Sequence, residues 1–283
     1  MLTDLLNKRV RPMLRKVGFG RAYARVFRSR DFARETFLHL RTRRSGVECT
    51  MNGSRFQVDS RTRFSFPPIH DPEVVRAYAR TLVAGDTCWN IGANVGEHVL
   101  QMARIVGPTG RVLAFEPNPE AAALLATNIH LNGYCNRVSI SEVAIGQCLG
   151  TTDFYFAGAN PMGRAQQPNP LLRRTRRITV PVKNMDSIFE DTERLPDCVL
   201  VDIEGWEIAA LLGAPRLLAA EPFPMLIIEL HPSAWAWSDH SRHDLEALVK
   251  RYSLQIAPLS GQHDPMSQYG QVMITREAPN QSH

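Results

Sequence analysis

Short apolar runs alternate with amphipathic segments over residues 87–145, and this alternation constrains the fold more than any other feature. Three segments have the composition of buried strands: Thr87–Ile91, Arg111–Phe115 and Val138–Ile145. The two segments between them, Glu97–Val106 and Pro119–Leu131, repeat apolar residues at helical spacing. Strands that alternate with helices are joined by crossovers and form a parallel sheet covered by helices. The sequence therefore predicts an α/β fold of the Rossmann-like type.

The alternation pauses after residue 145 and then resumes. Predicted strands at Gly150–Phe156 and Ile178–Val182 flank residues 158–177, a stretch rich in Pro, Gly, Asn and Arg that we expect to be a substrate lid for an anionic or glycan acceptor. The arginines of this stretch are Arg164, Arg173, Arg174, Arg176 and Arg177. Later strands are predicted at Cys198–Ile203, Met225–Leu230, Leu254–Pro258 and Gly270–Arg276, and helices at Trp206–Leu218 and Arg242–Tyr252. The last two strands are expected to pair as an antiparallel hairpin at one edge of the sheet.

Residues 1–70 are expected to form an extension, and residues 71–283 the Rossmann-like domain. Asn52-Gly53 lies between alternating polar and apolar residues and predicts a β-hairpin. Asp71 and Pro72 then open a predicted helix, as N-cap and first helical residue. Residues 1–44 hold 13 Lys or Arg and 3 Asp or Glu. This basic segment is either a helix that packs on the domain or an arm that contacts a membrane surface or nucleic acid.

Cysteine usage and hydropathy argue against several classes of protein. The five cysteines are scattered and form no CxxC pair, so neither a disulfide framework nor a zinc site is predicted, and we expect no metal. No apolar run approaches the roughly 18 residues that span a bilayer, and charges interrupt any signal-peptide core. We therefore expect a soluble protein of the reducing cytoplasm.

A glycine-containing segment, Asn90-Ile91-Gly92-Ala93-Asn94-Val95-Gly96, lies where a predicted strand turns into a helix. Gly92 and Gly96 allow a tight bend close to a ligand, and Asn94 tolerates a left-handed conformation. The order GxNxG lacks the third glycine of the dinucleotide fingerprint GxGxxG, which argues against an NAD-dependent enzyme. A turn of this kind can also be purely structural.

An acidic residue ends the following strand. Glu116 comes about 20 positions after the glycine turn, the spacing at which a carboxylate can accept hydrogen bonds from both hydroxyls of a ribose. NAD and S-adenosylmethionine both contain such a ribose, and the lack of a diphosphate-binding glycine pattern favours S-adenosylmethionine. Glu116 is therefore predicted to bind the cofactor ribose.

Two further predicted strands end in polar residues, Asp202 and Glu204 on one and Glu229 and His231 on the other. Ligands of open α/β sheets bind beyond the carboxyl ends of the strands, which places these residues at the mouth of the cleft. Asp202 could contact the methionine amino group, the acceptor or a metal, or could cap a helix. His231 is the better general-base candidate because an imidazole accepts a proton near neutral pH, and a structural histidine is an equal alternative.

Taken together, these motifs resemble the FkbM-type methyltransferases, a branch of the S-adenosylmethionine-dependent Rossmann-like enzymes. The resemblance covers roughly Asp71–Arg276 and rests on DTCWNIGANVGEH, VLAFEPNP, VAIG, VDIEGWE and LIIELHP, in this order. It implies a class I methyltransferase sheet of seven mostly parallel strands whose last strand is antiparallel. It also implies S-adenosylmethionine as cofactor and O-methylation of a hydroxyl on a small molecule, polyketide or sugar.

The resemblance also implies roles for individual residues. The implied cofactor-binding residues are Asn90, Gly92, Asn94, Gly96, Glu116, Val143, Ala144 and Asp202, of which Val143 and Ala144 would lie near the adenine. Asp202 and Glu204 would face the reaction centre, and His231 completes the predicted catalytic set. Two positions depart from the family pattern, where Asn90 replaces a usual Asp and Leu200 a common Lys. Low activity or a different acceptor therefore stays open.

Two other functions remain as alternatives. A nucleic-acid methyltransferase would explain the basic N-terminus, but the chain reads Asp202-Ile203-Glu204-Gly205 where amino-methylating DNA enzymes usually carry an Asn/Asp-Pro-Pro-aromatic loop. A non-catalytic cofactor-binding or scaffold protein would explain the changes at Asn90 and Leu200. We expect a small-molecule or glycan acceptor rather than a nucleic acid.

Overall fold

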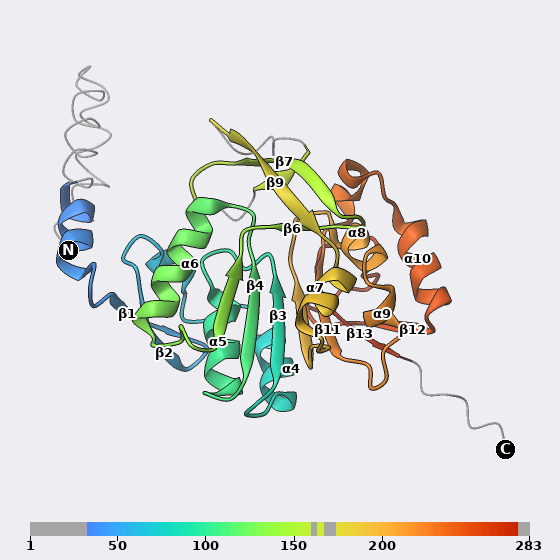
Figure 1. The fold of residues 1–283 in the computed structure, drawn as a ribbon, viewed down its shortest axis with the longest axis horizontal. Coiled ribbons are helices and arrows are strands. Elements are labelled where there is room, and N and C mark those ends of the chain that lie inside the picture. Colours follow the sequence, from blue (N-terminus) through green and yellow to red (C-terminus); the bar gives the residue numbers. More distant parts are fainter. Residues whose placement is uncertain (1–32, 160–162, 167–173, 277–283) are drawn as a thin grey trace.

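A computed structural model describes residues 33–159, 163–166 and 174–276. Its centre is a seven-stranded sheet with the order β12-β13-β11-β10-β3-β4-β5 (Figure 1). Neighbouring strands from β11 to β5 pair in parallel, and β13 is antiparallel to both β11 and β12. The strands are β3 (Thr87–Ile91), β4 (Arg111–Phe115), β5 (Val138–Ser141), β10 (Cys198–Val201), β11 (Met225–Leu230), β12 (Leu254–Pro258) and β13 (Gly270–Arg276). The predicted class I methyltransferase sheet and its antiparallel edge hairpin are confirmed.

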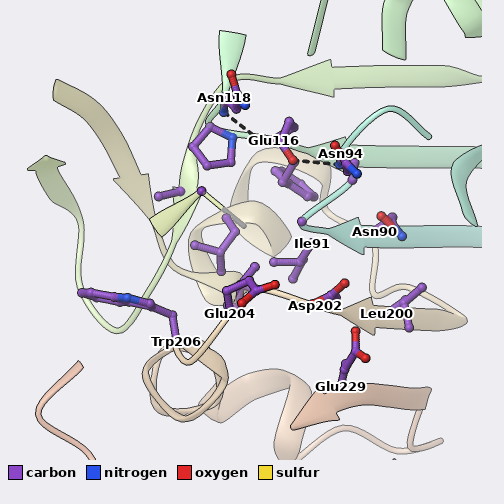
Figure 2. A pocket seen from close by; sticks show the side chains of 18 of the residues that line it. Asn90, Ile91, Asn94, Glu116, Asn118, Leu200, Asp202, Glu204, Trp206 and Glu229 are labelled. Carbon is purple, nitrogen blue, oxygen red and sulfur yellow. Dashed lines mark hydrogen bonds between the residues drawn. The ribbon is translucent and has the colours of Figure 1, made fainter. Parts of the chain in front are cut away.

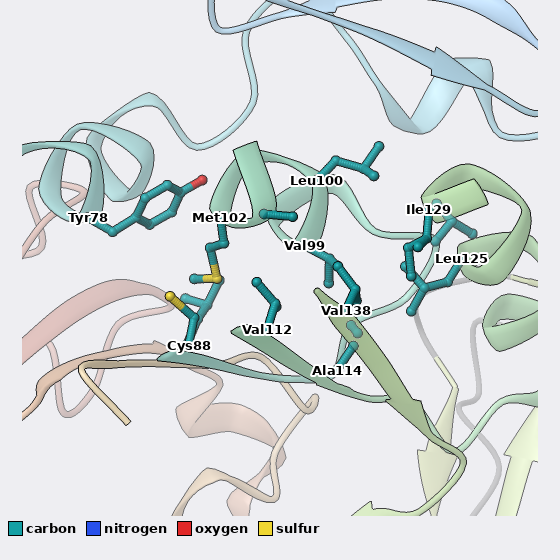
Figure 3. Packing of buried hydrophobic residues seen from close by; sticks show 14 of the residues in the cluster. Tyr78, Cys88, Val99, Leu100, Met102, Val112, Ala114, Leu125, Ile129 and Val138 are labelled. Carbon is teal, nitrogen blue, oxygen red and sulfur yellow. The ribbon is translucent and has the colours of Figure 1, made fainter. Parts of the chain in front are cut away.

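Alternate residues of each strand serve two separate cores, as the two-residue period of a strand requires. On one face, Cys88 and Val112 pack under α4 (Pro72–Thr81), α5 (Glu97–Val106) and α6 (Pro119–Leu131), as Figure 3 shows. On the other face, Trp89 and Val199 pack against a second set of helices. These are α7 (Met185–Thr192), α8 (Glu207–Leu212), α9 (Pro215–Leu218) and α10 (Arg242–Arg251). Burial on both faces explains why the central strands read as continuous apolar runs.

Three predicted segments differ in their bounds. The predicted strand Val138–Ile145 is wrong as one element, because the chain leaves the main sheet after Ser141 and Ala144 pairs instead with Val182 of a second sheet. The predicted helix Trp206–Leu218 is broken at Gly213, since Pro215 cannot donate a hydrogen bond within a helix and begins α9 instead. The strand predicted at Cys198–Ile203 ends at Val201.

A second sheet of four strands crosses one end of the molecule (Figure 1). It consists of β6 (Ala144–Ile145), β9 (Arg176–Lys183), β7 (Gly150–Phe156) and β8 (Arg164–Ala165), with its own buried cluster around Phe154 and Phe156. Part of the expected lid, residues 158–177, thus belongs to this sheet. Arg173 of that segment lies outside the described residues. Arg176 and Arg177 are exposed and pair with Glu120 and Asp153.

The predicted hairpin is confirmed, with strands β1 (Val47–Met51) and β2 (Ser54–Val58) joined by Asn52 and Gly53 at positive φ. It packs on α6, whose Asn128 and Asn132 side chains accept hydrogen bonds from the backbone N–H groups of Asp59 and Gln57. The expected helix of the basic segment falls mostly on residues 1–32, outside the described residues. Among the helices that are described, none combines the length and apolar composition needed to cross a bilayer.

Candidate functional site

A cavity of about 310 Å³ opens at the carboxyl ends of β3, β4, β10 and β11, and the second sheet forms its far wall (Figure 2). This volume lies at the lower limit of ligand pockets, which span about 300–1,000 Å³. Eight of the predicted site residues line it: Asn90, Gly92, Asn94, Glu116, Val143, Ala144, Asp202 and Glu204. Gly96 and His231 are not among the lining residues.

The turn after β3 requires glycine at its first position. Gly92 has φ +84°, and a Cβ added there would lie 1.8 Å from the carbonyl oxygen of Asp202. The N–H groups of Gly92 and Ala93 both donate to the carbonyl of Phe115, at 2.9 and 3.0 Å, which ties the turn to the end of β4. The backbones of β3, β4 and β10 therefore meet at a point where no side chain fits.

The second glycine of the motif has a packing role. Gly96 has φ +103°, and a Cβ at this position would lie 2.5 Å from Leu125 Cδ1 of α6. The residue lets α5 begin close against α6. The structure therefore gives Gly96 a place beside the hydrophobic core, although the sequence predicted it as a cofactor-binding residue.

Glu116 lies at the end of β4 with its carboxylate held in place by two backbone amides. Oε2 accepts from the N–H of Asn94 and Oε1 from the N–H of Asn118, both at 2.8 Å (Figure 2). Burial raises the pKa of Glu116 to about 7 even though these two hydrogen bonds favour the charged form. Each carboxylate oxygen keeps a further lone pair that can accept a hydrogen bond, and Glu116 lines the cavity.

Asn94 and Glu97 complete this region. Asn94 adopts φ +45°, and its Oδ1 is buried without a hydrogen-bond partner among the described residues. A buried acceptor of this kind is costly unless a ligand or water supplies a donor. Glu97 also lines the cavity, and burial raises its pKa to about 8. Sequence analysis missed Glu97, although an acidic residue directly after the glycine turn was a visible signal. We call Gly92, Asn94, Glu116 and Asn118 the turn end of the cavity.

Apolar residues cover the side of the cavity beside the turn end. Val143 approaches from the segment that connects β5 to β6, and Ala144, Phe154 and Ala165 from the second sheet. Trp206 also lines this part (Figure 2). A flat apolar ligand group would be enclosed between the end of the main sheet and the second sheet.

Asn90 and Leu200, the two departures from the family pattern, are neighbours in the main sheet. They pair in register between β3 and β10, and both line the cavity. Asn90 is buried. This part of the cavity floor is therefore uncharged.

Two carboxyl groups face each other at the ends of β10 and β11. Burial, together with the charge of Glu229 and a hydrogen bond to it, raises the pKa of Asp202 well above its ordinary range. Glu229 Oε1 also accepts from the Tyr269 hydroxyl and, at 3.0 Å, from Gln271 Nε2. The raised pKa favours the neutral, protonated form of Asp202 beside Glu229. Glu204 lines the cavity beside them with φ +55°.

His231 does not line the cavity, although one of its ring nitrogens lies within 4.8 Å of carboxylate oxygens of Asp202 and Glu229, which do. Its Nδ1 lies 2.9 Å from Oε1 of Glu207, a fully buried carboxylate that also accepts from the N–H of Gly205 and from Trp235 Nε1. Burial lowers the pKa of His231, but the hydrogen bond and charge of Glu207 outweigh this and raise it overall. The contacts favour a structural role, one of the two alternatives left open by the sequence.

Three residues that sequence analysis did not select, His70, Asp71 and His98, also line the cavity. Asp71 occupies the N-cap position of α4, as predicted, but its side chain makes no capping hydrogen bond and instead meets the two histidines. The hydrogen bond with His98 lowers the pKa of Asp71 despite burial, and burial and His98 lower the pKa of His70. We call His70, Asp71, His98, Asp202, Glu229 and Tyr269 the polar end of the cavity.

Comparison with known proteins gives one family match. Residues 90–254 match the model of the methyltransferase FkbM domain, which is more than half of the chain. A curated relative, the hexuronic acid methyltransferase AglP of Haloferax volcanii, is 26% identical over 164 residues. That alignment covers 57% of this chain and 62% of AglP, so the chain spans less than two thirds of this relative.

Solved structures show a looser likeness. A ribosomal protein L11 methylase from Lactobacillus delbrueckii subsp. bulgaricus is 12% identical with a TM-score of 0.42, over 73% of this chain and 78% of that one. A SAM-dependent O-methyltransferase from Thermotoga maritima is 13% identical with a TM-score of 0.38, over 73% of this chain and 66% of that one. At these scores neither structure carries a conclusion about this chain.

Proposed function

Because the chain belongs to the FkbM methyltransferase domain family, we propose that it transfers a methyl group from S-adenosylmethionine to a hydroxyl oxygen of a sugar or glycan. One observation supports this proposal above all others. The buried carboxylate of Glu116 and the partnerless Oδ1 of Asn94 lie together at the glycine turn of a cavity at the strand ends. Both are acceptors, and a ribose offers two hydroxyl donors.

The cavity residues fit the rest of the cofactor. Gly92 lets the turn lie against the residue that follows β10, because a Cβ there would lie 1.8 Å from the Asp202 carbonyl oxygen. Val143 and Ala144 would contact the adenine on the apolar side of the cavity. Asn90 and Asp202 would lie near the methionine portion, since they end β3 and follow β10 on the side away from Glu116.

S-adenosylmethionine supplies a methyl group on a positively charged sulfur. A positive charge beside Asp202 favours its ionised form, so binding of this cation would lower the raised pKa of Asp202 and favour loss of its proton. The freed carboxylate can then take the proton of the acceptor hydroxyl while the oxygen bonds to the methyl carbon and the carbon–sulfur bond breaks. A carboxylate whose pKa is raised toward the working pH is suited to this task. Asp202, rather than His231, is our proposed base, and Glu204 would face the acceptor.

The acceptor class rests on the relative. AglP is a hexuronic acid methyltransferase, and we propose a sugar or glycan acceptor of similar chemistry for this chain.

The five cysteines are unpaired, which suits a protein of the reducing cytoplasm.

Calorimetric titration with S-adenosylmethionine is the direct test of the cofactor site. Glu116→Gln removes the charge that receives the ribose hydroxyls and should weaken binding about tenfold or more, because hydrogen bonds to charged groups contribute about 1.5–3 kcal/mol. The matched control is Glu120→Gln. Glu120 lies on α6, and its exposed carboxylate pairs with Arg176 of β9. Absence of binding to the wild-type protein at millimolar cofactor would overturn the proposal.

Turnover separates an enzyme from a cofactor-binding scaffold. Labelled methyl groups should pass from S-adenosylmethionine to an oligosaccharide that contains hexuronic acid, and mass spectrometry of the product should place the label on oxygen. Cofactor binding without transfer to any extract component would favour the scaffold. Transfer to RNA or DNA would favour the nucleic-acid alternative.

A further inference from the structure

The polar end contains a cluster that the proposed methyl transfer does not use. His70 and Asp71 directly precede α4, and His98 lies in the first turn of α5. All three line the cavity and are partly exposed. Two imidazoles and a carboxylate thus face the same cavity as the proposed cofactor site.

The side chains converge on a single oxygen atom. His98 Nε2 lies 3.2 Å and His70 Nε2 lies 3.4 Å from Asp71 Oδ2. One potential ligand atom from each residue lies within 4.8 Å of the others. Nitrogen and oxygen ligands lie about 2.0–2.2 Å from a transition metal, so neighbouring ligands at tetrahedral or octahedral angles are about 3.0–3.6 Å apart. The two measured separations fall in this range.

Outer contacts orient two of the three groups. Gln271 Nε2 lies 3.2 Å from Asp71 Oδ1 and donates to it, which leaves Oδ2 for the histidines. His98 Nδ1 lies 3.3 Å from the hydroxyl oxygen of the buried Tyr78. In the tautomer that donates Nδ1–H to Tyr78, Nε2 carries the lone pair that binds metals. Outer-shell partners of this kind fix the ring orientation of ligating histidines in metal sites.

We propose that His70, Asp71 and His98 bind a divalent transition-metal ion at the polar end of the cavity. Two neutral imidazoles and one carboxylate are ligands of zinc, iron, manganese and related ions. A set of three protein ligands leaves coordination positions for water or for a ligand oxygen, as in catalytic rather than structural sites. We assign one of these positions to an oxygen of the sugar acceptor, and this assignment rests on the proposed function.

A second group of potential ligands, Asp202, Glu229 and His231, adjoins this cluster. Tyr269 and Gln271 both donate to Oε1 of its Glu229, and Nδ1 of its His231 pairs with Glu207. In the His70–Asp71–His98 cluster, the outside contacts of Asp71 and His98 fall on Oδ1 and Nδ1 and leave the proposed ligand atoms Oδ2 and Nε2 to the metal. This cluster is therefore the better site, and the second cluster is an outcome that the test must separate.

Titration of the full chain with Co²⁺ alone tests the proposal. Binding of one ion should produce visible ligand-field absorption, with an affinity in the micromolar range or tighter. His70→Gln, Asp71→Asn and His98→Gln keep the side-chain size and should each weaken Co²⁺ binding at least about tenfold, and Gln271→Met should weaken it by about tenfold through Asp71. The control His243→Gln, on the exposed face of α10, should bind like the wild type.

Two results would overturn the site: the wild type binds no Co²⁺ at millimolar metal, or the three ligand variants bind Co²⁺ as well as the wild type does. If Asp202→Asn loses Co²⁺ binding while His70→Gln keeps it, the ion binds at the second cluster instead. Circular dichroism of each variant must show the wild-type fold, and His70→Gln, from a partly exposed loop residue, keeps the test valid should His98→Gln unfold.

Cofactor binding is measured separately in metal-free protein. Co²⁺ binding without S-adenosylmethionine binding would leave the metal site standing while the proposed function fails. If both bind, and methyl transfer by metal-free protein does not rise on reloading with metal, the acceptor role is overturned and the ion site remains.

Discussion

The two ends of the cavity are built in different ways. The turn end draws Gly92, Asn94, Glu116 and Asn118 from a stretch of 27 residues, and its polar contacts are hydrogen bonds between one carboxylate and neighbouring backbone amides. The polar end draws on residues from His70 to Tyr269, and its contacts join side chains as far apart as Asp71 and Gln271, which are 200 positions apart in the chain.

The two ends are also separated in space. Glu116 ends β4 and Glu229 ends β11, with β3 and β10 between them in the sheet. Three strand spacings of about 4.8 Å place β4 and β11 about 14 Å apart. The local turn end thus determines where a nucleoside can bind. The order of the strands determines which polar side chains lie beside that nucleoside. The following predictions test this division.

The largest effect is expected from Gly92→Ala. The new Cβ would meet the Asp202 carbonyl oxygen, and alanine would also be held at positive φ, so we expect a loss of about 3–5 kcal/mol in the free energy of unfolding. Denaturant titration measures it. The control Gly133→Ala places alanine at φ +69° with open space around its Cβ, and should cost about 1 kcal/mol. Equal losses in the two variants would contradict a close approach of strands at Gly92.

The next effect concerns Glu116 and pH. The pKa of Glu116 is about 7 in the folded chain and about 4.5 as an ordinary side chain, so the unfolded state ionises first as pH rises. The stability that Glu116 contributes is therefore complete below pH 4.5 and is lost as pH rises to about 7. The loss is about 3 kcal/mol, since one pKa unit corresponds to about 1.4 kcal/mol.

The measurement is denaturation of ligand-free protein from pH 4.5 to 8. Glu116→Gln should remove this part of the decline, and Glu120→Gln should keep it. The sign reverses for ligand binding, because the ribose hydroxyls need the ionised form, and cofactor affinity should therefore rise over the same range. A pH profile of stability that is identical in wild type and Glu116→Gln would show that Glu116 is not held as a buried acid.

A smaller effect is expected at the polar end. Titration with S-adenosylmethionine in buffers of different ionisation enthalpy should reveal proton release from Asp202, because the cation favours its ionised form. S-adenosylhomocysteine, whose sulfur is neutral, should release fewer protons. Asp202→Asn should abolish the difference between the two ligands and weaken S-adenosylmethionine about tenfold, or about 1.4 kcal/mol. Equal proton release on binding of the two ligands would show that Asp202 does not lie beside the positively charged sulfur.

The smallest effect distinguishes two helix caps. The Asn118 side chain accepts from the N–H of Glu120 at 3.1 Å, and the Asn184 side chain accepts from the N–H of Ser187 at 2.8 Å. Replacement of either by alanine should reduce stability by about 1 kcal/mol. Only Asn118→Ala should also weaken cofactor binding, because loss of this cap loosens the backbone whose Asn118 N–H donates to Glu116. Equal cofactor affinities in Asn118→Ala and Asn184→Ala would show that the cap of α6 does not support the turn end.

Much of the molecule could be predicted from the sequence. The bounds of β3, β4, α5 and α6 match the predicted segments, because short apolar runs and apolar residues at helical spacing are local properties of the sequence. The predicted seven-stranded sheet rested on the family resemblance, and the strand order confirms it. Gly92, Asn94 and Glu116 line the cavity as predicted, whereas Gly96 does not. The glycine bend and the carboxylate lie together because they follow two neighbouring parallel strands of the sheet.

Other features had no local signal. The strand predicted at Val138–Ile145 divides between two sheets because β9, more than 30 residues later, supplies the partner of Ala144. His231 was judged by its place at a strand end, and only the packed structure shows that the buried Glu207 holds its ring. Asp71 was predicted as a helix cap, but its carboxylate meets the adjacent His70 and, through the approach of α5, also His98.

The sequence alone determined where strands and helices begin and where the chain bends, because backbone conformation and the alternation of apolar residues depend on near neighbours. The tertiary structure decided which side chains share the polar end, which histidines reach the cavity and which acid keeps its proton. These outcomes depend on burial and on distances between elements far apart in the chain, and such distances exist only once the sheet has assembled.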